Sequence, residues 1–180
     1  MNLLRFLFLF SPALAAHDTP PVTALEDDCH NSLCGIGQHI SIRDVPGKGK
    51  GAFTTVAIKK DAFLGYYFGE FLTSAEVYER YPDVYLGVEA TAEGGASYLF
   101  SLNDEDDEDD LYVDAAISFN WVRYVNHSTR RHNAIGFIDD SEPERPRVYL
   151  EALRDIAAGE EILIDYGEGY WEGVSFSVLD

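Results

Sequence analysis

The sequence predicts a mostly β fold, built from many short strands within a single domain. Its 180 residues are close to the usual size of one domain, and a hydrophobic fraction of 46% is enough to form a buried core. Aromatic residues, which favour strands, make up 13% of the chain, and 15 glycines supply turns. The apolar runs are short, and no long segment has the periodicity of a helix.

The first sixteen residues resemble a secretory signal peptide. Arg5 precedes the apolar run Phe6–Phe10, and Ala13-Leu14-Ala15 follows with the small residues of a cleavage site. The apolar run is too short to span a bilayer, so we expect no membrane span. A core segment or a misassigned gene start would explain the same residues. If the signal is real, the protein enters the secretory pathway or is secreted; otherwise we expect the nucleus or the cytoplasm.

Residues 17–37 have no periodic pattern and are interpreted as a linker that holds both cysteines of the chain. Cys29 and Cys34 could close a short disulfide in an oxidising compartment. Two cysteines cannot supply the four ligands of a structural zinc site, and no histidine–cysteine cluster of zinc-finger spacing accompanies them. The sequence therefore predicts no structural metal.

The first half of the predicted domain contains two strands and the best helical signal. Residues 39–42 alternate between apolar and polar side chains like a short strand, and 45–47 turn the chain. Residues 63–71 read as an apolar, aromatic strand that two glycines interrupt. A helix is predicted over 74–81, with Ser74 as its N-terminal cap.

The second half contains further short strands around an acidic run. Residues 98–102 and 111–113 are predicted strands, and the run 103–110 between them is predicted to be a solvated loop because its like charges repel. The apolar run 121–125 is interpreted as a strand. Two more strands are predicted before the C-terminus, over 147–150 and 161–164.

Four separated patches combine aromatic or polar side chains with glycines or strand ends. Each one alone is explained by ordinary structure, namely a turn, a core tyrosine or a capped turn. The third patch ends in three consecutive polar side chains, which are costly to bury unless every group has a partner. The patches are Gly49-Lys50-Gly51, Tyr67-Phe68-Gly69-Glu70, Arg123-Tyr124-Val125-Asn126-His127-Ser128 and Glu161-Ile162-Leu163-Ile164-Asp165-Tyr166-Gly167.

In this order and at these separations, the four patches resemble the SET domain of protein lysine methyltransferases. That family has G-x-G, Y-x-G-E, R-F-I-N-H-S-C-x-P-N and E-L-x-x-D-Y-G in the same order. The resemblance covers residues 38–172 and leaves 173–180 as a C-terminal tail. It implies several small β-sheets, few short helices and a pseudoknot near the C-terminus, where the N-H-S segment crosses the last strand. Periodicity alone would not predict such a threaded topology.

The resemblance also implies a cofactor, S-adenosylmethionine, and residues that bind it. The backbone of Gly49, Lys50 and Gly51 would hold the methionine part of the cofactor. Asn126 and His127 would contact it as well, His127 largely through its main chain at the adenine.

Protein-lysine N-methylation is the activity that the resemblance implies. Tyr166 would lie at the methyl-transfer channel, close to both the cofactor and the incoming amine, and Tyr67 would line the same channel. Arg123 would serve structure, for example by pairing with Glu161. A catalytically inactive SET domain that acts as a protein-binding module is the alternative.

The chain departs from the family pattern at several positions. Thr129 replaces the cysteine that binds a zinc ion after the SET domain, and no cysteine follows the domain. The family's C-x-P-N becomes the longer, proline-free segment 129–133. Tyr170-Trp171 would close the channel by hydrophobic packing instead. Ile164 stands where many members carry the aromatic residue that limits methyl number, so the product state is not predicted.

The charge of the chain bears on its partners. A net charge of −19 and a pI near 4.4 repel nucleic-acid phosphates and attract basic partners. We therefore expect a basic, lysine-containing protein or peptide substrate and no direct nucleic-acid binding, although excess acid could simply keep the protein soluble. A signal peptide would favour non-histone substrates. Calcium binding by Asp104–Asp110 is disfavoured because the run lacks the spacing of an EF-hand loop.

Overall fold

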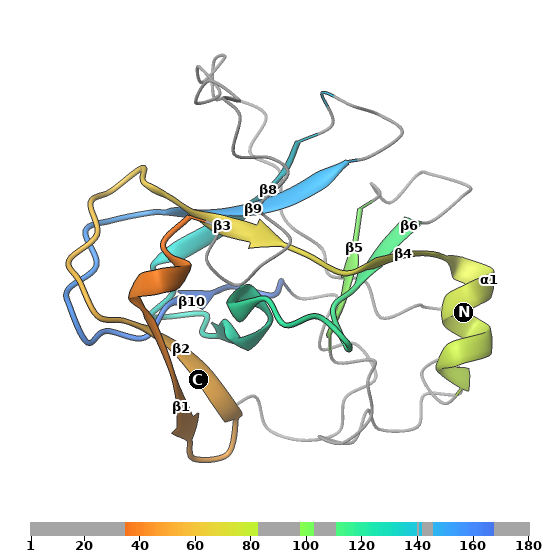
Figure 1. Ribbon diagram of the computed structural model, residues 1–180, viewed down its shortest axis with the longest axis horizontal. Coiled ribbons are helices and arrows are strands. Elements are labelled where there is room, and N and C mark those ends of the chain that lie inside the picture. Colours follow the sequence, from red (N-terminus) through yellow and green to blue (C-terminus); the bar gives the residue numbers. More distant parts are fainter. Residues whose placement is uncertain (1–34, 83–97, 103–110, 140, 142–145, 168–180) are drawn as a thin grey trace.

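The computed structural model describes residues 35–82, 98–102, 111–139, 141 and 146–167. Strands dominate these residues and form small separate sheets (Figure 1), so the predicted mostly β class is confirmed. The described elements are η2 (Gly37–His39), β1 (Ile40–Val45), β2 (Gly49–Thr54), β3 (Phe63–Tyr67), β4 (Glu70–Thr73), α1 (Ser74–Arg80), β5 (Leu99–Ser101), β6 (Leu111–Asp114), η4 (Trp121–Tyr124), β7 (Asn126–His127), β8 (Ala134–Asp139), β9 (Arg147–Ala152) and β10 (Leu163–Ile164).

Several sequence predictions lie outside the described residues. They concern the signal peptide at 1–16, most of the linker at 17–37, the acidic run at 103–110 and the tail at 173–180. The cysteine pair and Tyr170-Trp171 belong to the same group. These stay predictions. Within the described residues, no helix is long and apolar enough to cross a membrane.

Among the described strands, three of the six pairs join consecutive strands and three join strands that are separated in the sequence. β1 and β2 form an antiparallel hairpin, β3-β9-β8 and β4-β6-β5 form three-stranded antiparallel sheets, and β7 pairs with β10 in parallel. Figure 1 shows β10 and η4 in the middle of the molecule, between the hairpin and the sheet of β3, β9 and β8. This central position is filled by the largest core cluster, which includes Ala52, Leu64, Trp121, Leu150 and Ile162.

The predicted strand at 63–71 is divided into β3 and β4 at Gly69. A Cβ atom at Gly69 would lie 2.2 Å from the carbonyl oxygen of Asp114, so only glycine lets the two backbones approach this closely.

The strands at 98–102, 111–113 and 147–150 are confirmed as β5, β6 and β9. β8 is not predicted by the sequence pattern, because Gly136 interrupts its apolar run.

The helix α1 is confirmed, but its predicted cap is wrong. Thr73, not Ser74, is the N-cap: its hydroxyl accepts a hydrogen bond from the Glu76 amide, and the Glu76 carboxylate accepts one from the Thr73 amide at 2.8 Å. This reciprocal capping box requires the two residues to be three positions apart, which only Thr73 satisfies. The bonds lower the pKa of Glu76.

The apolar run 121–125 forms a 3-10 helix instead of the predicted strand. The side chain of Asn120 caps η4 by accepting the amide proton of Val122 at 2.8 Å. Trp121 and Val122 are buried, whereas Arg123 and Tyr124 are only half-buried. A short apolar run has no periodicity that separates a strand from a buried helical turn, so the cap decides its conformation.

A crossing near the C-terminus joins β7, β10 and the segment that follows β7. β10 pairs with β7 on one side, through Leu163 opposite Asn126 and Ile164 opposite His127. Asn133 contacts the same segment: its amide group donates to the Glu161 carbonyl at 2.8 Å and accepts from the Leu163 amide at 2.9 Å. The chain after β7 therefore wraps around the last strand, as the resemblance implied.

Candidate active site

The parallel pairing of β7 and β10 brings three of the predicted site residues together. His127 lies at the end of β7, and its Nδ1 accepts a hydrogen bond of 3.0 Å from the amide of Tyr166, just beyond β10. The two rings pack with centroids 5.3 Å apart. Asn126 precedes His127 and reaches the β1–β2 hairpin, where its side-chain Nδ2 donates to the Lys50 carbonyl at 3.0 Å.

The contacts of His127 determine which of its ring nitrogens carries the proton. Nδ1 accepts a backbone N–H, so it carries no proton, and the neutral ring holds its proton on Nε2. Nε2 lies 3.1 Å from the hydroxyl of Thr129, which can accept this proton. Thr129 thus replaces the family cysteine with a group that fixes the orientation of a buried histidine ring.

The two glycines of the first patch have different surroundings. Gly49 has a φ of 75°, a conformation that favours glycine, and apart from its chain neighbours no atom of the described residues lies within 4 Å of where its Cβ would be. A Cβ on Gly51 would instead lie 2.5 Å from Glu161 Oε1 and 3.0 Å from Asn126 Nδ2. Gly49 therefore leaves open space that a ligand can approach, whereas Gly51 makes room for two side chains of the protein itself.

Lys48 joins the site, although the sequence patterns did not single it out. Its amine donates to the His127 carbonyl at 2.8 Å and so connects the hairpin turn to β7. The main chain of His127 is expected to contact the adenine, and a carbonyl oxygen with two lone pairs can accept a second donor besides Lys48. The position of Lys48 next to the first glycine of G-x-G was the only signal that could have found it.

The two tyrosines predicted to line the channel have similar environments. The Tyr166 hydroxyl donates to the Val125 carbonyl at 2.6 Å, and the Tyr67 hydroxyl donates to the Tyr98 carbonyl at 2.7 Å. Both rings are partly buried against the same apolar cluster, which contains Phe100, Val113 and Val148. The structure therefore brings together two side chains that are 99 positions apart in the sequence.

The predicted pairing of Arg123 with Glu161 is wrong. The guanidinium of Arg123 donates to the Ser118 carbonyl at 2.9 Å and lies 3.9 Å above the ring of Tyr98. Arg123 is in η4, and the 3-10 turn directs its side chain towards these groups. Glu161 accepts a hydrogen bond of 2.9 Å from Asn126 Nδ2 instead.

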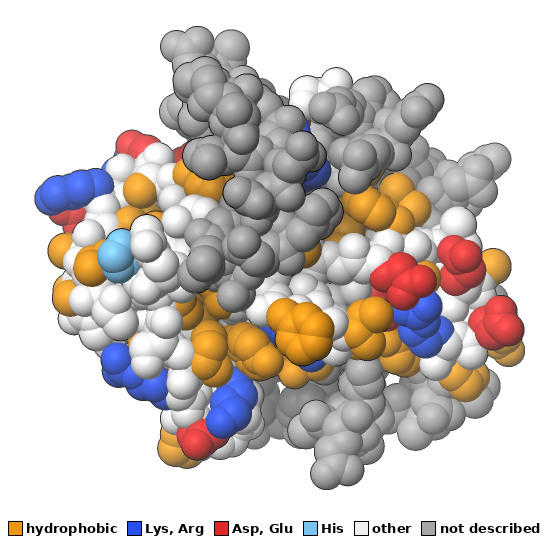
Figure 2. All heavy atoms as spheres, in the orientation of Figure 1, with side chains coloured by type: hydrophobic (Ala, Val, Ile, Leu, Met, Phe, Trp, Pro, Cys, Tyr) orange, Lys and Arg blue, Asp and Glu red, His pale blue; other side chains and the backbone are white. Residues whose placement is uncertain are grey.

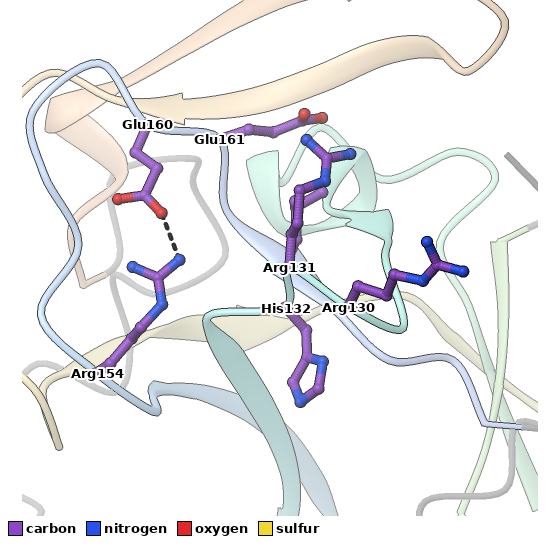
Figure 3. Close-up of a pocket in the computed structure, with 7 residues that line it drawn as sticks. Arg130, Arg131, His132, Arg154, Glu160 and Glu161 are labelled. Atoms are coloured by element: carbon purple, nitrogen blue, oxygen red, sulfur yellow. Dashed lines mark hydrogen bonds and ion pairs between the residues drawn. The ribbon is translucent and has the colours of Figure 1, made fainter. Parts of the chain in front are cut away.

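Glu161 also forms part of the wall of a surface cavity of about 320 Å³. Figure 3 shows the neighbouring side chains Glu160 and Glu161 pointing to different sides: Glu160 binds Arg154, and Glu161 extends away from that pair. Arg154, together with bonds from Ala157 and Asn133, lowers the pKa of Glu160 to about 2. Glu160 is therefore an ionised structural group, whereas Glu161 is directed towards the predicted cofactor residues.

The visible surface combines charged groups with apolar ones. Figure 2 shows hydrophobic side chains gathered between basic groups over the β1–β2 hairpin and mixed charges over α1. Phe119, between β6 and η4, is 93% exposed, and Ile117 is 76% exposed.

No group of three or more metal-ligating side chains occurs among the described residues. The prediction that the domain needs no zinc stays a prediction.

Comparison with known proteins identifies the family. A family model for the SET domain matches residues 49–167. This chain belongs to the SET-domain family. The match includes all four patches, so the resemblance inferred from the motifs is confirmed.

Curated relatives are longer than this SET domain. The chain is 38% identical over 144 residues to histone-lysine N-methyltransferase SUV39H2 of Homo sapiens, covering 77% of this chain and 33% of the relative. It is 29% identical to histone-lysine N-methyltransferase Su(var)3-9 of Drosophila melanogaster over 174 residues, which are 93% of this chain and 26% of the relative. The chain thus spans about a third of the length of these relatives or less.

Solved structures share the fold of this SET domain. The crystal structure of CpSET8 from Cryptosporidium matches with a TM-score of 0.57 and 27% identity, over 72% of this chain and 57% of that one. A humanised Polycomb Repressive Complex 2 from Chaetomium thermophilum, bound to the inhibitor GSK126, matches with a TM-score of 0.56 and 28% identity, over 72% of this chain and 15% of that one.

Proposed function

We propose that this SET domain transfers a methyl group from S-adenosylmethionine to the side-chain amine of a lysine in a basic protein or peptide. The observation that carries the proposal is the meeting of three of the four patches: the Gly49 backbone, Asn126, His127 and Tyr166 lie around the crossing of β7 and β10. The relatives named as histone-lysine methyltransferases support the reaction class.

The residues present fit the proposed cofactor. Gly49 offers backbone that, apart from its chain neighbours, no described residue covers at its Cβ side, which suits the methionine part of the cofactor. The side-chain oxygen of Asn126 and the carbonyl of His127 are acceptors for the cofactor's amino groups. When bound, S-adenosylmethionine supplies a methyl group that its positive sulfur has already activated.

The remaining task of the protein is to deliver a neutral, aligned amine. With a reference pKa of about 10.4, fewer than about one lysine in a thousand is neutral at pH 7, which costs about 4–5 kcal/mol. A narrow, partly buried aromatic channel lowers this cost because it disfavours the charged form. Holding the amine in line with the methyl group lowers the activation barrier further, because two positioned groups react in an effectively unimolecular step.

The hydroxyls of Tyr67 and Tyr166 are suited to this task. Each one donates its proton to a backbone carbonyl, so each presents oxygen lone pairs and not a proton to the channel. A lone pair can accept an N–H of the amine and orient it. Because the hydroxyls stay neutral, they do not add the negative charge that would hold the extra proton on the lysine.

The experiment is methyl transfer by the full chain from labelled S-adenosylmethionine. Core histones and a lysine-rich peptide serve as substrates, and mass spectrometry locates the methylated lysine. S-adenosylhomocysteine should also stabilise the protein against heat, by about 2.7 kcal/mol at a hundredfold excess over Kd. Absence of both binding and transfer would contradict the proposal. Binding without transfer to any lysine substrate would favour the inactive, protein-binding alternative.

A further inference from the structure

Asn126 has an amide group whose two N–H bonds are both in use. Nδ2 donates to the Lys50 carbonyl at 3.0 Å and to Glu161 Oε1 at 2.9 Å. An asparagine amide has two N–H donors, so these two acceptors take its whole donor capacity. An oxygen placed at the Nδ2 position would face two acceptor oxygens and be repelled. The orientation of the amide is thus set by its partners.

Glu161 can hold this position only because residue 51 is a glycine. Any Cβ at Gly51 would meet Glu161 Oε1 at 2.5 Å and Asn126 Nδ2 at 3.0 Å. Glu161 itself is held by neighbouring backbone: it forms a bridge with Phe53, and the next residue, Ile162, donates to the Ala52 carbonyl at 2.8 Å. Strand β2 and the backbone just before β10 therefore place Glu161 beside Asn126.

We infer that Glu161 is a positioning residue that turns the Asn126 side-chain oxygen towards the α-amino group of the cofactor. Once both N–H bonds are used, Oδ1 is the polar atom of the side chain that remains for a ligand, and among the described residues it has no partner. An oxygen acceptor recognises a donor such as an ammonium group and disfavours a carboxylate. Glu161 would thereby make the pocket selective for the amino acid end of the cofactor. This inference rests on the proposed function.

The test measures binding of S-adenosylhomocysteine by calorimetry, without any turnover. Glu161→Ala frees one N–H of Asn126, so the amide can rotate and present a donor; we expect affinity to fall about tenfold, as for the loss of a hydrogen bond to a charged group. Asn126→Ala should have a similar or larger effect. In the double variant the effect of Glu161→Ala should vanish, because the residue acts through Asn126. Additive effects would overturn the inference.

A second ligand separates positioning from a general structural role. An analogue of S-adenosylhomocysteine without its α-amino group should bind the wild type more weakly than the parent compound. Glu161→Ala should reduce this discrimination, because the analogue lacks the group that Asn126 recognises. If both ligands lose affinity equally, Glu161 merely supports the fold. If the wild type binds neither ligand, the proposed function itself fails, so the two failures are distinguishable.

Two further variants keep the test informative if Glu161→Ala does not fold. Glu161→Gln retains an oxygen acceptor for Asn126 and should bind S-adenosylhomocysteine within a few-fold of the wild type; a folded Glu161→Gln protein that binds tenfold more weakly contradicts the inference. Glu160→Gln is the matched control, because Glu160 binds Arg154 and points to a different side from Glu161 (Figure 3). It should lower thermal stability and leave the affinity of the folded protein unchanged.

Discussion

The two ends of the short β7–β10 pair differ in how deeply the side chains that contact them are buried. At the end near Asn133, the amide is 1% exposed and bonds to Glu160, the Glu161 carbonyl and the Leu163 amide. At the other end, Tyr166 is half-buried beside His127, whose Nδ1 accepts its amide proton. We expect the first, closed end to stabilise the crossing and the second, open end to serve the proposed chemistry. One pair of strands would thus separate stability from function.

The largest effect on the closed end is expected from Asn133→Ala. This change removes three hydrogen bonds and leaves a buried carbonyl and a buried amide without their partner, which costs about 3 kcal/mol or more. Denaturant unfolding monitored by tryptophan fluorescence measures the loss. A variant as stable as the wild type would mean that the closed end does not carry the stability of the crossing.

At the open end, Tyr166→Phe should lower the rate of methyl transfer with little loss of stability, the reverse of what we expect for Asn133→Ala. Phenylalanine preserves the packing against His127 and removes one positioned polar group, so kcat should fall by about 10²–10³-fold while cofactor affinity persists. A core tyrosine without a catalytic role would instead lose about 1–3 kcal/mol of stability with activity intact. Measuring both quantities on one protein preparation decides between these roles.

The ionised Glu160 predicts how the closed end responds to acid. Because its pKa in the folded protein is about 2, below the ordinary value of 4.5, folding binds fewer protons at this group. The contribution of the ionised Glu160 carboxylate to the free energy of unfolding is complete above pH 4.5 and is lost as the pH falls towards 2. The side chain is 31% exposed, so screening reduces the contribution to about 1–2 kcal/mol. Glu160→Gln should flatten the pH dependence of stability over this window; an unchanged profile would contradict it.

The smallest effect is expected at the cap of α1, which gives the scale of an ordinary local contact. Thr73→Ala removes the hydroxyl of the capping box and should cost about 1 kcal/mol. Ser74→Ala is the matched control and should change stability by less than about 0.5 kcal/mol. Equal costs for the two variants would mean that the box does not stabilise the helix.

The sequence predicted the residues of the cofactor and channel motifs better than the contacts of the closed end. Gly49, Asn126 and Tyr166 belong to motifs with a recognisable order, and the structure places them around one crossing. The pairing of Asn133 with β10 depends on a contact 30 positions away, which no local pattern encodes. The crossing itself was implied only by the resemblance.

Errors in the local predictions have common physical causes. The strand expected at 121–125 is a 3-10 helix because a short apolar run suits both structures. The pairing of Arg123 with Glu161 followed charge alone, whereas the chain directs Arg123 to Ser118 and Tyr98. Both errors arise where tertiary geometry decides between locally acceptable partners.

The parallel pairing of β7 with β10 also determines when the protein can first bind its ligand during synthesis. Asn126 and His127 leave the ribosome well before Tyr166, and their bonds to Glu161 and to the Tyr166 amide cannot form until the last strand has emerged. Closing this long loop costs conformational entropy before any of the pairing contacts form. All strands of the sheets β1–β2 and β4-β6-β5 emerge earlier, so these sheets can form first, and the predicted cofactor residues come together only when residue 166 has emerged.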